Sequence, residues 1–437
     1  MRPLFFVACL AASIASCSDP GTAPGGGSGS ASASPAAAPA AKKVPHVLTQ
    51  TERDNLMDLG DAFAKAVSAG DNDAMGKLWN VDVLWDRIAD GIAIPKSDLA
   101  KSGIEFKSGM KAKGASPLGD IAGMPCSFRM IREDDQEGPS LLFRLLPESG
   151  GVNYFECQID DLAADHPKIC DAFVFLSGEL LSNTVKRLLA PLLAQESKTP
   201  LQKLFSEKDP LSEHQDAILK AMASLRSGDP EAALNTLDAL PASVRSNKFV
   251  LIFRFNAVSQ LYDTSQDPPP FEKEYLAAIG ELKTHLSGDP RSQLLLIDYH
   301  LLNGDYEAFY QSLDKLAEVV GNDGYVEYLR ATGLSQEGKH EAALASGKRA
   351  VDFEPENEAI HLGIVDVLVG AGKFQETADQ LVFLQEEYGY QFDFAGMVEM
   401  EAFLNSEPGR AWLDRQQGDQ TDPTIPEGGP ASEATPQ

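Results

Sequence analysis

Cysteine has the most reactive side chain in this chain, and its five copies decide much of the chemistry that the sequence can support. They are Cys9, Cys17, Cys126, Cys157 and Cys170. No two of them form a Cys-x-x-Cys pair, and no cysteine and histidine stand at the spacing of metal ligands. The seven histidines are scattered. The sequence therefore predicts no metal site.

Cys17 ends a segment that predicts export and covalent attachment to lipid. After Arg2 comes an apolar run from Leu4 to about Ala15, which is too short to span a bilayer and is typical of a secretory signal. The run closes with Ile14-Ala15-Ser16-Cys17. This tetrapeptide resembles the lipobox of bacterial lipoproteins, whose cysteine is acylated and becomes the new N-terminus. The resemblance implies a signal peptide over residues 1–16 and a two-chain anchor on Cys17, which is stable where one chain is marginal.

The alternative is an ordinary cleaved signal followed by an incidental cysteine. Cys9 is a poorer lipidation site, because the run before it is too short and Phe6 stands where an aliphatic residue is expected. Ser18 follows Cys17, where an aspartate would resemble the signal for retention in the inner membrane. In a Gram-negative cell the resemblance implies the periplasmic face of the outer membrane.

Composition separates the rest of the chain into tethered and folded parts. Residues 17–45 are rich in Gly, Ser, Ala and Pro, and we expect them to be a disordered tether; residues 418–437 read as a disordered tail. The net charge of −28 argues against nucleic acid and anionic lipid as partners, because both need clustered Lys and Arg. We therefore expect membrane contact through the acyl chains alone.

Residues 46–196 predict an α+β domain, with helices on one face of a curled antiparallel sheet. Thr49 and Glu52 have capping-box spacing at the start of a helix that ends at Gly70. Four strands are expected at 126–131, 141–146, 152–159 and 169–175, followed by a closing helix. Polar and apolar residues alternate in the third strand, which predicts one face in water.

Two cysteines of these strands raise the question of a disulfide. If Asp160 pairs with Pro167 across the turn, Cys157 and Cys170 face each other. An oxidising compartment permits the bond. Directly opposed strand residues need suitable Cβ geometry, however, and buried free cysteine is common. The sequence therefore does not decide between a disulfide and two free thiols.

The segments 61–71, 152–155 and 171–175 resemble the NTF2-like (cystatin-like) α+β family. That family includes enzymes with a cone-shaped pocket as well as inert binding modules. Enzymatic members usually place an Asp, His or Tyr in the cone as acid or base. Here the resemblance offers Asp171, Tyr154 and His166, of which His166 stands in a predicted turn. Such residues more often lie on a solvated strand face, so we predict no catalytic residue and no cofactor.

Gly304, Gly338 and Gly372 stand 34 residues apart, and each lies in a turn between two helical runs. A fixed period of this length is typical of a helical-hairpin solenoid. Such arrays usually present a concave surface to a partner.

The stretch Gly338–Leu344, with Ala350, Pro355 and Asn357 after it, resembles the second-helix half of a tetratricopeptide repeat. Gly228–Leu234 matches the same half. After a linker at 197–213, the resemblance implies a solenoid over residues 214–417 with a capping helix near 394–416. Its five hairpins would lie near 214–241, 244–288, 290–322, 324–357 and 358–391. The triple proline before Phe271 predicts a loop within the second hairpin.

In that family the inner face of each first helix lines a binding groove. The groove residues carried over by spacing are Arg291, Leu294, Asp298, Tyr325, Tyr328, Thr332, Leu362 and Asp366, with Leu301, Ser335, Ala359 and Val369 in further lining positions. The two tyrosines are the expected anchors, since aromatic residues often anchor interfaces. The alternative is that they pack on the neighbouring hairpin.

The favoured interpretation is a non-enzymatic, membrane-anchored lipoprotein of the cell envelope that binds a protein or peptide. The alternative is a small-ligand carrier or an enzyme that uses a pocket in the NTF2-like domain, with the solenoid as recruiter. An open pocket with convergent polar groups would favour the second interpretation, and a sealed apolar interior the first.

Overall fold

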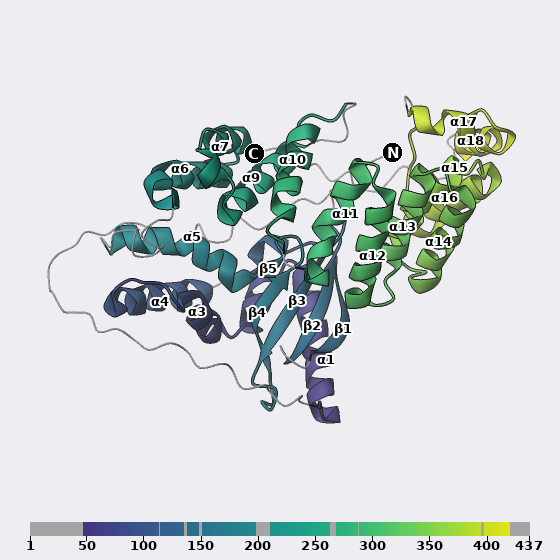
Figure 1. The fold of residues 1–437 in the computed structure, drawn as a ribbon. Helices are drawn as coiled ribbons and strands as arrows, with labels where there is room; N and C mark the ends of the chain where they lie inside the picture. Colours follow the sequence, from purple (N-terminus) through teal and green to yellow (C-terminus); the bar gives the residue numbers. More distant parts are fainter. Residues whose placement is uncertain are drawn as a thin grey trace. The chain divides into compact units, whose positions relative to one another are not determined.

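The structure is a computed structural model of the 437-residue chain. It describes residues 47–419, apart from 113, 135–137, 148–150, 198–209, 263–267, 287 and 395–396. The predicted signal peptide, Cys17, the tether and the end of the chain from residue 420 lie outside the described residues. The chain forms two compact units, residues 2–320 and 321–437, which are described separately (Figure 1). The first unit thus extends beyond the predicted linker at 197–213.

The first unit begins with helices. Helix α1 (Gln50–Ser68) is followed by α2 (Asn72–Lys77), α3 (Val81–Ala89), α4 (Lys96–Met110) and the 3₁₀ turn η1 (Gly119–Ile121). The predicted capping box is confirmed: the Thr49 hydroxyl accepts from the Glu52 amide, and the Glu52 carboxylate accepts from the Thr49 amide at 2.7 Å. Gly70 ends the helix with a φ of 67°.

An antiparallel meander follows, which confirms the expected sheet. Strands β1 (Cys126–Asp134), β2 (Gly138–Leu145), β3 (Asn153–Asp160), β4 (Lys168–Val174) and β5 (Glu179–Leu180) lie in the order β1-β2-β3-β4-β5. All four predicted strands are present. The fifth was not predicted, because two residues are too few to show an alternation of polar and apolar side chains.

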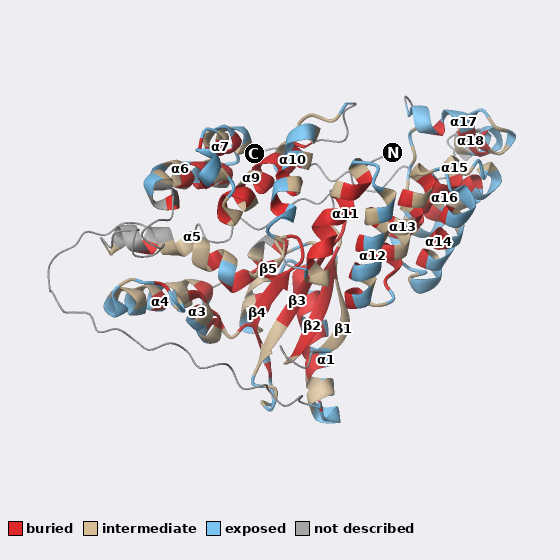
Figure 2. Cartoon of the chain, in the orientation of Figure 1, coloured by how far each residue is buried: buried red, intermediate tan, exposed pale blue. Residues whose placement is uncertain are grey.

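Both faces of the middle of the sheet are covered, so the expected wet face of β3 is wrong. On one face α1 packs through Phe63, whose ring lies 4.9 Å from that of Phe143. On the other face Tyr154 is fully buried and Glu156 is only 2% exposed. Figure 2 shows β2 and β3 coloured as buried. Glu156 is buried because Arg291, from the helical part of this unit, contacts it.

The predicted pairing of Cys157 with Cys170 is also wrong. Asp160 pairs with Lys168, and a bulge then shifts the register between Gln158 and Ile159, so that Cys157 faces Ala172. Cys170 is the extra residue in the bulge, and its thiol donates to the Gln158 carbonyl at 3.4 Å. Both cysteines are free thiols.

Helices make up the rest of the first unit. They are α5 (Leu181–Glu196), η3 (Pro210–His214), α6 (Gln215–Arg226), α7 (Pro230–Asp238), α8 (Ala242–Arg245), α9 (Lys248–Leu261), α10 (Glu272–Lys283), η4 (Pro290–Ser292), α11 (Gln293–Leu302) and α12 (Tyr306–Val320). Contacts join α6 with α7, α9 with α10 and α11 with α12. One apolar cluster runs from Leu211 to Leu296 through these helices.

The second unit is helical in its described residues. It contains α13 (Gly324–Gln336), α14 (His340–Phe353), α15 (Glu358–Gly370), α16 (Phe374–Tyr388), η5 (Val398–Met400), α17 (Glu401–Leu404) and α18 (Glu407–Asp419). The pairs α13–α14 and α15–α16 are in contact. Where one capping helix was expected near 394–416, η5, α17 and α18 stand instead, and Trp412 of α18 is buried against this end of the unit.

The three evenly spaced glycines occupy equivalent turns. Gly304, Gly338 and Gly372 have φ values of 68°, 78° and 66°, and each lies between the two helices of a pair. This left-handed conformation is strained for a residue with a Cβ atom. The expected helix-turn-helix pairs are therefore present at these three places.

Close packing of α13 on α15 depends on Gly363. A Cβ atom at this position would overlap the ring of Tyr328. Small residues permit such close approach of two helices, and a side chain forced into the contact strains it.

We expect Gly363→Ala to lower the free energy of unfolding by about 1–3 kcal/mol, although alanine is normally the better helix former. Urea unfolding of the full chain measures the effect. A double-mutant cycle with Tyr328→Ala is the control: because the added methyl group enters the space that the ring leaves, the double variant should be less destabilised than the sum of the single ones. Additive losses would contradict the proposed contact.

Candidate functional site

The three acid–base candidates of the first unit do not converge on one site. Asp171 is fully buried, and its carboxylate accepts from the Ser182 amide at 3.1 Å and from the Ser182 hydroxyl at 2.6 Å. Arg87 lies 3.2 Å from the same carboxylate. Tyr154 is buried beside Phe175, with 5.6 Å between the ring centroids. His166 is exposed. Asp171 therefore anchors the start of α5.

Two of the predicted groove residues of the first unit, Leu294 and Asp298, are buried, so their assignment to an open surface is wrong. Leu294 is fully buried and Asp298 is 2% exposed. The Asp298 carboxylate accepts from the Tyr275 hydroxyl at 3.3 Å, because α10 packs on this side of α11. The Arg291 side chain is 11% exposed and is held by acidic residues. The inner face of α11 is thus part of the core.

The expected tyrosine anchors of the second unit are also packed inside. Tyr325 is 5% exposed and lies edge-on to Tyr328, with 5.4 Å between the ring centroids. Tyr328 packs against Gly363 of α15. The alternative interpretation, packing on the neighbouring hairpin, therefore holds for both. Leu362 and Asp366 of α15 are exposed, and Thr332 is partly exposed.

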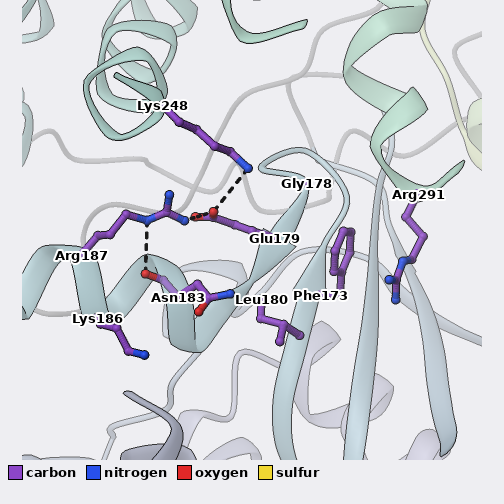
Figure 3. Close-up of a pocket in the computed structure, with 9 residues that line it drawn as sticks. All are labelled: Phe173, Gly178, Glu179, Leu180, Asn183, Lys186, Arg187, Lys248 and Arg291. Atoms are coloured by element: carbon purple, nitrogen blue, oxygen red, sulfur yellow. Dashed lines mark hydrogen bonds and ion pairs between the residues drawn. The ribbon is translucent and has the colours of Figure 1, made fainter. Parts of the chain in front are cut away.

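The first unit contains a pocket that sequence reasoning missed (Figure 3). It is open to solvent and has a volume of about 580 Å³. Strands β4 and β5 contribute to it, together with α5, α9 and η4. Its lining residues are Phe173, Gly178, Glu179, Leu180, Asn183, Lys186, Arg187, Lys248 and Arg291.

One carboxylate on this pocket is shared between two cations. Glu179 is 7% exposed, and it forms ion pairs with Arg187 and, at 3.7 Å, with Lys248. Its other oxygen accepts from the Thr184 hydroxyl at 2.7 Å. Figure 3 shows the Arg187 and Lys248 side chains reaching the carboxylate from two different helices.

The two cations interact unfavourably with each other. Burial lowers the pKa of the Arg187 guanidinium. Burial and the nearby Arg187 charge lower the pKa of the Lys248 ammonium. Only the Lys248 shift therefore reports the neighbouring cation, whereas the Arg187 shift reports burial.

A second ion cluster lies at the other side of the pocket. The Arg291 guanidinium lies 2.7 Å from Asp289, 3.1 Å from Glu156 and 4.0 Å above the centre of the Phe173 ring. Arg132 also binds Glu156, at 2.5 Å. Burial alone would raise the pKa of Asp289, but its hydrogen bonds with Arg291 hold that pKa below its ordinary value. Two cations and two carboxylates therefore balance here.

No local sequence signal could have found this pocket. Its residues come from segments as far apart as Phe173 and Arg291, and none of them forms a motif. The alternation of polar and apolar residues in β3 made Glu156 look like a solvent-facing residue and so gave no clue to its partner Arg291.

Two kinds of feature are missing from the part of the chain that the structure describes. No three histidine, cysteine, aspartate or glutamate side chains gather there as a metal site would require. None of the described helices has the length and apolar character needed to cross a bilayer.

Burial of Asp298 predicts a pH-dependent stability. Burial raises the pKa of this carboxyl well above its ordinary value. The stability that the protonated form contributes is present below the unfolded pKa of about 3.9 and is lost as the pH rises through the folded pKa. Asp298→Asn cannot ionise, so we expect it to melt at least about 2 °C above the wild type at pH 8 and close to it at pH 4.

Thermal melts followed by circular dichroism at the two pH values test this expectation. Asp61→Asn, which changes an exposed carboxylate of α1, is the matched control and should show no such difference. If Asp298→Asn were equally destabilising at both pH values, the carboxyl would be acting only through its hydrogen bond with Tyr275.

Comparisons with known proteins give no information on the function, which must therefore be inferred from the residues of this chain. A scan against protein-family models, a search of curated proteins and a search of solved structures found no match to this chain. The tetratricopeptide-repeat and NTF2-like resemblances therefore stay hypotheses drawn from the sequence.

Proposed function

We propose that this protein is a membrane-anchored lipoprotein of the cell envelope that acts as a non-enzymatic scaffold and binds a protein or peptide through its helical pairs. One observation carries the proposal: helix pairs recur with a left-handed glycine at positions 304, 338 and 372. Repetition of a helical hairpin is the construction of tetratricopeptide-repeat solenoids, and such arrays commonly serve as binding surfaces. The dispersal of the acid–base candidates of the first unit also favours a binding role over catalysis.

The binding surface that remains is the exposed side of α15. Leu362 is 39% exposed, and Asp366 follows it one turn later on the same face of the helix. An apolar contact beside a carboxylate suits a helical or extended segment that carries one apolar and one basic residue. The buried tyrosines take no direct part and instead fix the position of α15 through Gly363.

We expect the double variant Leu362→Ser with Asp366→Ala to weaken partner binding at least tenfold, because it removes both the apolar contact and the charge. Quantitative affinity capture from envelope extract, followed by titration of the captured partner, measures the change. The control is Phe353→Ser with Asp379→Ala, which alters an equally exposed apolar residue and an exposed carboxylate on α14 and α16. Equal binding by wild type, test variant and control would exclude α15 as the site.

A separate experiment tests the proposed lipid anchor on Cys17. Cys17→Ala should lose labelling by radioactive fatty acid and should leave the membrane fraction for the soluble one, because the acyl chains are the proposed membrane contact. Ser18→Ala, which alters the neighbouring residue and keeps the thiol, is the control. Membrane association of the Cys17→Ala chain would contradict the lipid anchor without affecting the proposed binding surface.

A further inference from the structure

The pocket of the first unit carries more positive charge than its own residues neutralise. Arg291 is balanced by Asp289 and Glu156, which Arg132 also contacts. On the other side, Lys186, Arg187 and Lys248 line the pocket together with one carboxylate, Glu179. Three cations and one anion leave a local excess of two positive charges, in a chain whose net charge is −28. The sign of the charge in this part of the pocket is therefore opposite to the net charge of the chain.

The excess lies where solvent screens it poorly. The side chains of Arg187 and Lys248 are only 26% and 25% exposed, and they share one carboxylate. Like charges held close together at low exposure repel each other, and a bound anion would relieve this repulsion. The pKa of the Lys248 ammonium is lowered by burial and by the nearby Arg187 charge, which agrees with such a repulsion.

The pocket also offers an apolar surface beside the cations. Leu180, which is partly exposed, lies next to Glu179 in Figure 3, with Lys248 and Arg187 on one side and Arg291 on the other. Phe173 also lines the pocket, but it is 8% exposed and Arg291 lies over its ring, so Leu180 supplies most of the apolar surface. A volume of about 580 Å³ is within the usual range for small-molecule sites. A bare inorganic ion would leave the apolar surface unused, whereas an amphipathic molecule would use both parts.

We propose that this pocket binds a small organic anion, in which a carboxylate or phosphate group is attached to an apolar body. The anionic group lies near Lys186, Arg187 and Lys248, and the apolar body lies against Phe173 and Leu180. This proposal is independent of the scaffold function, since no residue of α15 takes part in it.

Isothermal titration calorimetry on the full chain tests the proposal with three probes: 4-phenylbutyrate, phenyl phosphate and the neutral 4-phenylbutanol. We expect one of the two anions to bind saturably at one site per chain, at least tenfold more tightly than the alcohol. Preference for 4-phenylbutyrate would identify a carboxylate ligand, and preference for phenyl phosphate a phosphate monoester. Absence of saturable binding by both anions, or equal binding of the alcohol, would overturn the proposal.

Variants separate this pocket from other basic surfaces. Lys186→Met should weaken anion binding at least threefold and Lys248→Met at least tenfold, whereas Lys315→Met, which changes an exposed side chain of α12, should leave it unchanged. Glu179→Gln should strengthen binding, because it removes the competing carboxylate. Circular dichroism checks the folding of each variant. If Lys248→Met and Glu179→Gln do not fold, the affinity of Lys186→Met for the anion tests the assignment. Wild-type affinity in a folded Lys186→Met chain would overturn the assignment.

Discussion

The buried ion pair of Glu156 and Arg291 is the interaction on which the first unit depends. The two residues are 135 positions apart, and their atoms lie 3.1 Å apart at a place where both side chains are nearly excluded from solvent. Removing such charges from water is costly unless every partner is present, and here Arg132, Ser140 and Asp289 complete the set. Losing one partner of a buried pair typically costs about 3–5 kcal/mol. The pair joins β3 of the sheet to η4 of the helical part, within the compact unit that ends at residue 320.

The two binding sites proposed for this chain, the pocket of the first unit and the surface of α15, lie in different units and have different character. In the first unit, charge is concentrated where the sheet meets the helices, and the pocket with its excess of cations lies there. In the second unit, the packing of Tyr328 on Gly363 brings α13 and α15 close together and leaves Leu362 on the outside. A ligand for the pocket would be recognised by charge and an apolar body, whereas a partner on α15 would be recognised by shape and a single apolar contact.

Local patterns in the sequence predicted much of the fold, because they report local physics. The Thr49–Glu52 capping box, the four longer strands and the left-handed glycines each depend on a few neighbouring residues, and all were found.

The predictions that failed depend on contacts between residues that are far apart in the sequence. Glu156 resembles a solvent-facing strand residue until Arg291 is brought to it, and Asp298 and Tyr325 resemble groove residues until α10 and the neighbouring helices cover them. The cysteine register failed in two steps: Asp160 pairs with Lys168 instead of Pro167, and the bulge at Cys170 then shifts the later pairs by one more residue. The pocket was out of reach for the same reason, since its residues meet only in the folded chain.

The bulge and the burial of the thiols have a consequence for how this chain matures. Burial raises the pKa of Cys170 to about 11 and of Cys126 to about 12, and it raises that of Cys157 well above its ordinary value. Thiolates are the species that exchange with disulfides, so the folded protein contains almost none of the reactive form at neutral pH. The unfolded chain has no such protection. In any compartment that oxidises thiols, folding and oxidation would therefore compete for the same unfolded molecule, and the speed of folding, rather than a covalent bond, would preserve the native sheet.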